Sequence, residues 1–226
     1  MLGILALDTR FERIVGDAGN PESYPFAVRI KVVAGADSPL VVRDGAPDEA
    51  LVARFIAAAQ ALEAEGARAI ISTCGFLVNV QDRIAAAVDV PVMLSALSLY
   101  PLVRASCAGR VAILTASKPS LGARSMASAG IDAADVVVMG CEDIAGFAES
   151  FLAPQERQAA RLDREVLEAA LVEKVKVMMG DYPDIGALLF ECGNLPPYAK
   201  AISRAAGRPV FHMLHGAALV MGAQER

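Results

Sequence analysis

The chain has 226 residues, of which 55% are hydrophobic and 21% are charged, so it can bury a sizeable core and does not have the composition of a disordered protein. At roughly 100 to 150 residues per domain, this length favours two domains over one. The formal net charge of −5 argues against a general surface for nucleic acid or anionic membranes, because either partner would require an excess of Lys and Arg.

Export and membrane insertion find no support in the sequence either. Residues 1–7 are apolar but lack a basic leader, and Asp8 ends the run, so this segment does not have the pattern of a signal peptide. No apolar stretch approaches the roughly 18 uncharged residues that a membrane-spanning helix needs. Four cysteines in a chain without an export signal indicate reduced thiols. We therefore expect a cytoplasmic protein, with neither a membrane nor a nucleic acid as its partner.

Short β-rich runs alternate with segments of helical periodicity along the chain. Residues 3–7 and 28–33 are predicted strands, and the first helix is predicted over 47–65, where Pro47 suits the first turn and Gly66 ends the pattern. The later predicted strands are 69–72, 90–94, 111–114, 136–139, 185–190 and 209–212, and the helices between them are 79–88, 119–129, 154–179 and 196–206. This alternation predicts an α/β protein with parallel sheets. We expect the charged part of the longest helix, 155–176, to be a solvated face.

An internal repeat divides the chain in two. Residues 68–92 align without a gap with residues 186–210, at a constant offset of 118 (192 − 74). Eight of the 25 aligned pairs are identical, namely Ala69/Ala187, Cys74/Cys192, Gly75/Gly193, Leu77/Leu195, Ile84/Ile202, Ala87/Ala205, Pro91/Pro209 and Val92/Val210. The first strands of the two copies, 4–7 and 111–114, correspond at an offset of 107, so the first copy carries about 11 extra residues (118 − 107), which we place in the polar loop 10–25.

The repeat predicts two related α/β halves that face each other across a pseudo-twofold axis. We assign residues 1–96 to the first half and residues 97–212 to the second. A C-terminal helix at about 213–226 is expected to pack back on the first half. This arrangement would leave a cleft between the halves.

Each repeated cysteine, Cys74 and Cys192, directly follows a predicted strand and precedes a predicted helix. Ligands bind at this edge of open α/β sheets. A thiol at a helix N-terminus is expected to have a lowered pKa, because the free N–H groups and the helix dipole stabilise the thiolate. Two such thiols on opposite sides of a cleft could exchange protons with the two faces of one carbon, as a two-base racemase requires.

The segments Ile-Ser-Thr-Cys-Gly-Phe-Leu (71–77) and Phe-Glu-Cys-Gly-Asn-Leu-Pro-Pro-Tyr (190–198) resemble the paired cysteine motifs of the aspartate/glutamate/hydantoin racemase superfamily. The resemblance covers nearly the whole chain. It implies two Rossmann-like or flavodoxin-like halves, Cys74 and Cys192 as the catalytic acid/base pair, and a small carboxylate or amino-acid-like substrate in the cleft. It also implies that no cofactor is needed and that the protein is a homo-oligomer, most simply a dimer.

Ten further residues are expected to contact the substrate. Asp8 and Thr9 end the first strand, where amino-acid racemases of this superfamily place polar substrate contacts, and Thr115 and Ser117 end the equivalent strand. Asn20 belongs to a loop that either covers the cleft or is only a polar surface loop. The remaining candidates flank the two cysteines: Thr73, Gly75, Phe76, Gly193 and Asn194. An alternative role for Asp8 is that of a turn carboxylate at a strand end.

The residues after each cysteine differ from those of glutamate racemases, which have Asn-Thr after the first cysteine and Thr-His after the second. Here they are Gly75-Phe76 and Gly193-Asn194. Small Cys-Gly turns would offer backbone N–H groups to the oxyanion of an enediolate, and Phe76 would supply an apolar wall. The first hypothesis is a cofactor-independent racemase or epimerase. The alternatives are a decarboxylase or cis–trans isomerase like the arylmalonate decarboxylases and maleate isomerases, and a non-catalytic module that binds an organic acid.

The other cysteines and the two histidines are interpreted as structural. Cys107 and Cys141 have no counterpart in the repeat and are expected to be packed side chains. His212 and His215, with Cys192, have only a weak likeness to a zinc site, so we predict packing rather than a metal, with a supporting role for His212 beside the cleft left open. Nucleotide-binding glycine motifs and a serine-hydrolase motif are absent from the sequence.

Overall fold

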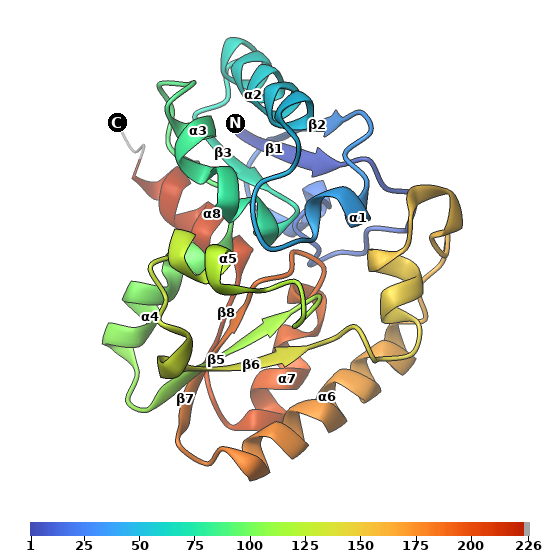
Figure 1. Ribbon diagram of the computed structural model, residues 1–226, viewed down its shortest axis with the longest axis vertical. Helices are drawn as coiled ribbons and strands as arrows, with labels where there is room; N and C mark the ends of the chain where they lie inside the picture. The colour runs from blue at the N-terminus through green and yellow to red at the C-terminus, as the bar shows by residue number, and fades with distance from the viewer. Residues whose placement is uncertain (224–226) are drawn as a thin grey trace.

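The structure, a computed structural model, describes residues 1–223 and consists of two α/β halves stacked one on the other (Figure 1). Each half contains one four-stranded, all-parallel sheet, with the orders β2-β1-β3-β4 and β6-β5-β7-β8. The two orders are the same once the strands are numbered within each half. The predicted fold class, a pair of similar parallel-sheet halves, is confirmed.

The strands are short and mostly buried on both faces, because helices cover the sheets. Their bounds are β1 Leu2–Leu7, β2 Val28–Val33, β3 Ala69–Ser72, β4 Val92–Met93, β5 Arg110–Thr115, β6 Val136–Gly140, β7 Ile185–Phe190 and β8 Val210–Phe211. All six residues of β1 are buried, as a central strand of a covered parallel sheet requires. Every predicted strand is present, and β2, β3 and β7 have the predicted bounds.

The helices are α1 Ser38–Val41, α2 Glu49–Ala64, α3 Gln81–Ala85, α4 Tyr100–Ser106, α5 Ala123–Ser128, α6 Arg164–Asp181, α7 Ala199–Ala206 and α8 Met213–Gly222. The longest helices begin at aspartates: the side chain of Asp48 accepts from the N–H of Leu51, and that of Asp163 from the N–H of Val166. No helix within residues 1–223 is long and apolar enough to cross a membrane.

Three predicted helices are shorter than expected. The predicted helix 79–88 is α-helical only in α3, and a 3-10 helix, η2 (Gly75–Val80), precedes it. The predicted helix 119–129 is reduced to α5. The predicted helix 154–179 begins only at Arg164, because the segment before it leaves the helical path to contact the first half.

That segment joins the two halves along one side (Figure 1). It contains the π-helix η5 (Ala148–Leu152), which contacts α1, and two glutamines that follow it. Gln155 donates from Nε2 to Asp8 Oδ1 at 2.5 Å, and the Gln158 side chain accepts from the N–H of Arg10 at 2.8 Å. Residues 155–163 are therefore not part of the expected helix, and Gln155 and Gln158 hold the halves together, whereas Glu156, Arg157 and Arg161 are exposed as expected.

The register of the sheets corrects the alignment of the first strands. Leu2 of β1 pairs with Ala69, and Val111 of β5 pairs with Ala187, so the structural offset is 109 (111 − 2) and not 107. The extra length before the first cysteine is therefore nine residues (118 − 109).

Helix α8 returns from the second sheet to the first and packs against β3 and β4 (Figure 1). Gly216 permits this close approach, because a Cβ there would lie 2.5 Å from the Met93 sulfur. The last residues of the predicted C-terminal helix, 224–226, lie outside the described residues.

Candidate active site

A cavity lies between the halves, at the carboxyl ends of the central strands. Ten of its lining residues come from the first half: Leu7, Thr9, Phe11, Arg13, Ser38, Val42, Thr73, Cys74, Gly75 and Phe76. Six come from the second half: Ala116, Phe151, Leu152, Glu191, Cys192 and Asn194. The two repeated cysteines thus face one shared space.

The two Cys-Gly turns pack against each other reciprocally. A Cβ at Gly75 would lie 2.3 Å from the carbonyl oxygen of Glu191, and a Cβ at Gly193 would lie 2.4 Å from the carbonyl oxygen of Thr73. Thr73 and Glu191 each precede a cysteine and are equivalent in the repeat (191 − 73 = 118), so the same contact occurs twice. Glycine is needed at both positions because any side chain would push the turns apart, and this approach brings the two thiols to one cavity.

Cys74 lies at the start of η2 and is buried. Burial, and then the nearby Glu191 carboxyl, raise the pKa of the Cys74 thiol well above its ordinary value. The backbone N–H groups of Phe76 and Leu77 lower that pKa, but they do not outweigh burial. The lowered thiol pKa expected from a helix N-terminus is therefore wrong, because that expectation left out the loss of water around the sulfur.

Cys192 is held by a chain of polar side chains that runs through Asn194 to Asp17 and Arg13 of the first half. Its thiol donates to Asn194 Oδ1 at 3.5 Å, and Asn194 Nδ2 donates to Asp17 Oδ2 at 2.6 Å. Asp17 is buried and receives a second charge-assisted bond, from Arg13 Nη1 at 2.8 Å. Burial, and then Glu191, raise the pKa of Cys192. The acceptor on Asn194 favours Cys192 as a protonated thiol.

Glu191 is a buried carboxyl next to both thiols. Its Oε2 accepts from Thr115 Oγ1 at 2.9 Å and from the N–H of Ala116 at 3.3 Å, whereas its Oε1 is buried without a hydrogen-bond partner. Burial raises the pKa of Glu191 to about 7, although these two hydrogen bonds lower it. This group therefore changes its charge near neutral pH.

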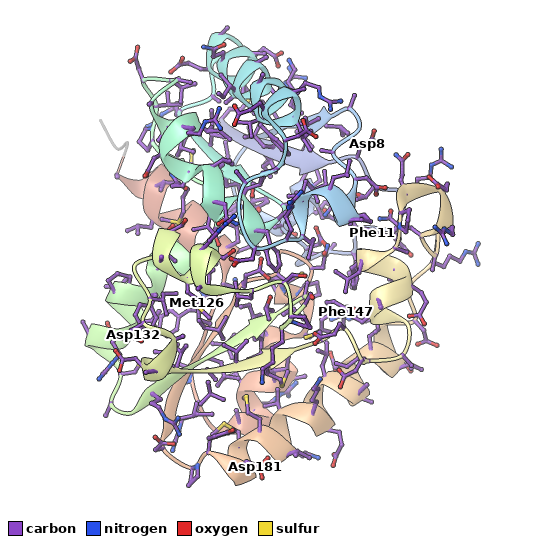
Figure 2. The ribbon with its side chains drawn as sticks, in the orientation of Figure 1. Asp8, Phe11, Met126, Asp132, Phe147 and Asp181 are labelled. Carbon is purple, nitrogen blue, oxygen red and sulfur yellow. The ribbon has the colours of Figure 1, made fainter. Side chains whose placement is uncertain are left out.

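The opposite wall is aromatic. Phe11 and Phe151 meet edge to face with ring centroids 4.9 Å apart, and Phe147 packs against Phe151 at 4.8 Å. Figure 2 labels Phe11 in the first half and Phe147 in the second. The guanidinium of Arg13 lies 4.7 Å from the Phe11 ring centroid and donates to Thr9 Oγ1 at 3.1 Å. One cation and several phenyl rings thus share the cavity with the thiols.

Seven of the twelve predicted site residues line this cavity: Thr9, Thr73, Cys74, Gly75, Phe76, Cys192 and Asn194. The other five do not: Asp8, Asn20, Thr115, Ser117 and Gly193.

Each of these five has a structural partner instead. Asp8 accepts from the N–H of Gly35 and from Gln155, which is the role of a turn carboxylate. Asn20 caps the 3-10 helix η1 (Pro21–Ser23) and donates to the Arg13 carbonyl. Ser117 bonds to Ser120. Thr115 donates a hydrogen bond to Glu191, and Gly193 packs against the carbonyl oxygen of Thr73.

Sequence reasoning missed nine of the sixteen residues that line the cavity, among them Glu191, Arg13, Phe11 and Phe151. Glu191 lies inside the quoted second motif, and its place beside a cysteine at a strand end was the signal that could have found it. Phe11 and Arg13 lie in the loop after β1, and Phe151 lies in the π-helix η5. Only the packing of the halves shows that they reach the cavity.

The histidines lie apart from the cavity. The His212 and His215 rings are 4.0 Å apart, and burial, and then His215, lower the pKa of His212 to about 3. Neither lines the cavity. No group of three or more His, Cys, Asp or Glu that could hold a metal ion exists within residues 1–223.

Two equivalent parallel sheets with a cysteine turn from each at a shared cavity are the architecture of the aspartate/glutamate/hydantoin racemase superfamily. Unliganded arylmalonate decarboxylase has this fold (TM-score 0.62, 18% identity, 100% of this chain and 94% of that chain). So does allantoin racemase from Klebsiella pneumoniae (TM-score 0.59, 15% identity, 98% of this chain and 89% of that chain). The superfamily resemblance inferred from the cysteine motifs is confirmed.

Two curated relatives define the branch of the superfamily. The chain is 32% identical over 218 residues to a dimethylsulfoniopropionate lyase of Durusdinium sp. clade D. The aligned region covers 93% of this chain and 70% of that protein. The chain is also 32% identical over 221 residues to dimethylsulfoniopropionate lyase 7 of Emiliania huxleyi, which covers 93% of this chain and 63% of that protein. No protein-family model matches the chain. The chain belongs to the family of these lyases within the racemase superfamily, and it spans about two thirds of their length.

Proposed function

We propose that the chain is a lyase that removes the proton α to the carboxylate of a small 3-sulfonio carboxylate, with dimethylsulfoniopropionate as the representative substrate. The observation that carries this proposal is that two thiols, one arginine and a phenylalanine wall line one buried cavity. Its relatives are named for this reaction. This set of side chains fits an acid–base elimination better than a transfer of groups to a nucleotide or metal.

The reaction needs a base at one carbon and a leaving group at the next. A thiolate takes the α-proton, the C–H electron pair forms the double bond between the α and β carbons, and the bond from the β carbon to sulfur breaks. The sulfur leaves as neutral dimethyl sulfide with the bonding pair, and acrylate remains. One proton is released overall. The α-proton becomes acidic because the carboxylate oxygens take up charge as it leaves.

The cavity supplies a group for each part of such a substrate. Arg13 is the cation for the carboxylate, because its guanidinium lines the cavity and its side chain is only 17% exposed. Phe11, Phe76 and Phe151 supply faces for the sulfonium, since a positively charged onium group is attracted to phenyl rings. A bound sulfonium would also favour the thiolate form of a neighbouring cysteine, which burial alone disfavours.

We assign Cys74 as the base. The backbone N–H groups of Phe76 and Leu77 lower the pKa of Cys74 and so favour its thiolate. Cys192 instead donates its proton to Asn194, which suits a thiol that gives a proton and not one that takes it.

Racemisation is the second candidate, and one observation favours it. The thiols come from opposite halves to one cavity, and the Asn194 acceptor suits Cys192 for the role of the acid. A substrate without a β leaving group could lose its α-proton to Cys74 and gain one from Cys192 on the other face.

The test combines product analysis with cysteine variants. The purified protein is incubated in D₂O with dimethylsulfoniopropionate or with a panel of amino acids and hydantoins, while headspace gas chromatography follows dimethyl sulfide and NMR follows acrylate and α-deuterium. We expect dimethyl sulfide and acrylate in equal amounts, and a loss of about 100-fold or more in rate for Cys74→Ala. Cys107→Ala, a thiol outside the cavity, is the matched control and should keep full activity.

The outcomes separate the candidates. A smaller loss for Cys192→Ala than for Cys74→Ala supports the lyase with Cys74 as base. Exchange of α-protons without dimethyl sulfide, lost in both variants, supports racemisation. Neither product nor exchange would contradict both.

A further inference from the structure

The buried carboxyl of Glu191 has one oxygen that the fold leaves unsatisfied. Thr115 and Ala116 occupy Oε2, but Oε1 has no hydrogen-bond partner although it is buried. Leaving a buried polar atom unpaired is costly, and native proteins do so rarely. Oε1 lies against the Cys74–Gly75 turn, because a Cβ at Gly75 would be 2.4 Å from it. The free oxygen is therefore buried against the turn that carries the proposed base.

The charges around Glu191 are mostly acids. Its carboxyl raises the pKa of Cys74, Cys192 and Cys141, which follow β3, β7 and β6. Among residues 1–223, Arg13 is the one cation that lines the cavity, and it is paired with Asp17. Two negative charges in one buried space repel each other strongly, so the site favours a single charge shared among these acids.

We propose that Glu191 is the proton partner of Cys74: a proton moves from Cys74 Sγ to Glu191 Oε1, so that one negative charge passes between carboxylate and thiolate without leaving the cavity. This inference rests on the proposed function and explains how the Cys74 thiolate, the base of the proposed lyase, is formed. Before the reaction the pair is a thiol and a carboxylate, and after the internal transfer it is a thiolate and a carboxylic acid. The thiolate takes the α-proton of the substrate, and the extra proton then leaves from Glu191 to water, which restores the first state.

The shared charge has a measurable consequence. Below the pKa of Glu191, near 7, each unit of pH raises the thiolate population tenfold. Above it, the pair has already lost its one proton, so the thiolate fraction stays constant until the second proton leaves. Reactivity of Cys74 should therefore rise to about pH 7 and then level off.

The first experiment measures the rate of Cys74 alkylation by iodoacetamide from pH 5.5 to 9 (roughly the span in which the carboxyl and a free thiol titrate), with mass spectrometry of the Cys74 peptide. Wild-type protein should show the plateau. In Glu191→Gln the rate should keep rising tenfold per pH unit, so that near pH 9 the variant reacts about 100-fold faster than wild type. Glu173→Gln, on an exposed carboxylate of α6, is the matched control and should keep the plateau.

A second variant tests the same pairing without removing the carboxyl. Thr115→Val deletes the hydroxyl that lowers the pKa of Glu191, so the start of the plateau should move up by about one pH unit. A purely structural role for Glu191 would not move it. A wild-type rate without a plateau, or a plateau that persists in Glu191→Gln, would overturn the inference.

Turnover gives an independent check. The pH dependence of kcat/KM for dimethylsulfoniopropionate should show the same plateau and the same loss of it in Glu191→Gln. If Glu191→Gln is inactive at every pH while its Cys74 still reacts with iodoacetamide, Glu191 is itself the base and the inference is overturned. A plateau in alkylation with no turnover by wild type would contradict the proposed function and leave the proton pairing standing.

Discussion

A methyl group at position 75 would strike the carbonyl oxygen of Glu191 at 2.3 Å and its Oε1 at 2.4 Å, where real contacts of this kind are essentially never under 3.0 Å. The first of these atoms belongs to the backbone after β7 and cannot rotate away. Gly75→Ala must therefore separate the two cysteine turns by several tenths of an ångström or more. Gly193→Ala should do the same from the other side, since its Cβ would meet the carbonyl oxygen of Thr73 at 2.4 Å.

The cost follows from overpacking. Forcing one methyl group into a closely packed site costs about 1–3 kcal/mol. A protein of this size loses about 2–4 °C in Tm per kcal/mol, so each variant should melt about 2–12 °C lower than wild type. The activity loss should exceed what this destabilisation explains, because a shift of even 1 Å between reacting groups can cost about 100-fold in rate.

Thermal unfolding followed by circular dichroism checks the first number, and the dimethyl sulfide assay at a temperature where all variants are folded checks the second. Gly180→Ala is the control: it lies inside α6 with no atom within 4 Å of the new Cβ, so it should stabilise the protein by up to about 1 kcal/mol. If Gly75→Ala melts with wild type and keeps its activity, the reciprocal packing of the turns does not position the thiols.

Three further perturbations act on buried polar groups. Asn194→Ala leaves the Asp17 carboxylate without its 2.6 Å partner, so we expect a loss of about 1–3 kcal/mol in urea unfolding and slower turnover; unchanged stability would contradict the polar chain to Cys192. Burial raises the pKa of Glu191 from 4.5 to about 7, so its contribution to stability is present below pH 4.5 and lost as pH rises through 7. Glu191→Gln should therefore have a higher free energy of unfolding than wild type at pH 8, by on the order of 3 kcal/mol. Near pH 4.5 the two proteins should be equally stable. Burial lowers the pKa of His212 from 6.5 to about 3, so its contribution is present above pH 6.5 and lost as pH falls; unfolding at pH 6.5 and 5 should show a loss of about 2 kcal/mol that His212→Phe largely removes.

The sequence alone determined the order of the strands and helices and the equivalence of Cys74 and Cys192 in the repeat. Short, continuous apolar runs predict strands such as β3 and β7, because a strand that is buried on both faces has mostly apolar side chains along its length. The repeat at an offset of 118 predicted that Cys74 and Cys192 are equivalent, and the superfamily resemblance predicted that they share a cleft. Both features follow from local residue patterns and from an internal duplication, which the sequence shows without any knowledge of the tertiary structure.

The composition of the cavity was decided by tertiary structure. Phe11 and Arg13 reach it from the loop after β1, Phe151 reaches it from the π-helix η5, and Asp8 is turned away by Gln155, a residue 147 positions later. The state of the thiols was decided there as well. Their position after a strand suggested a lowered pKa, but protonation depends on how much water and which charges surround the sulfur, and only the packing of Glu191 between the two turns sets both.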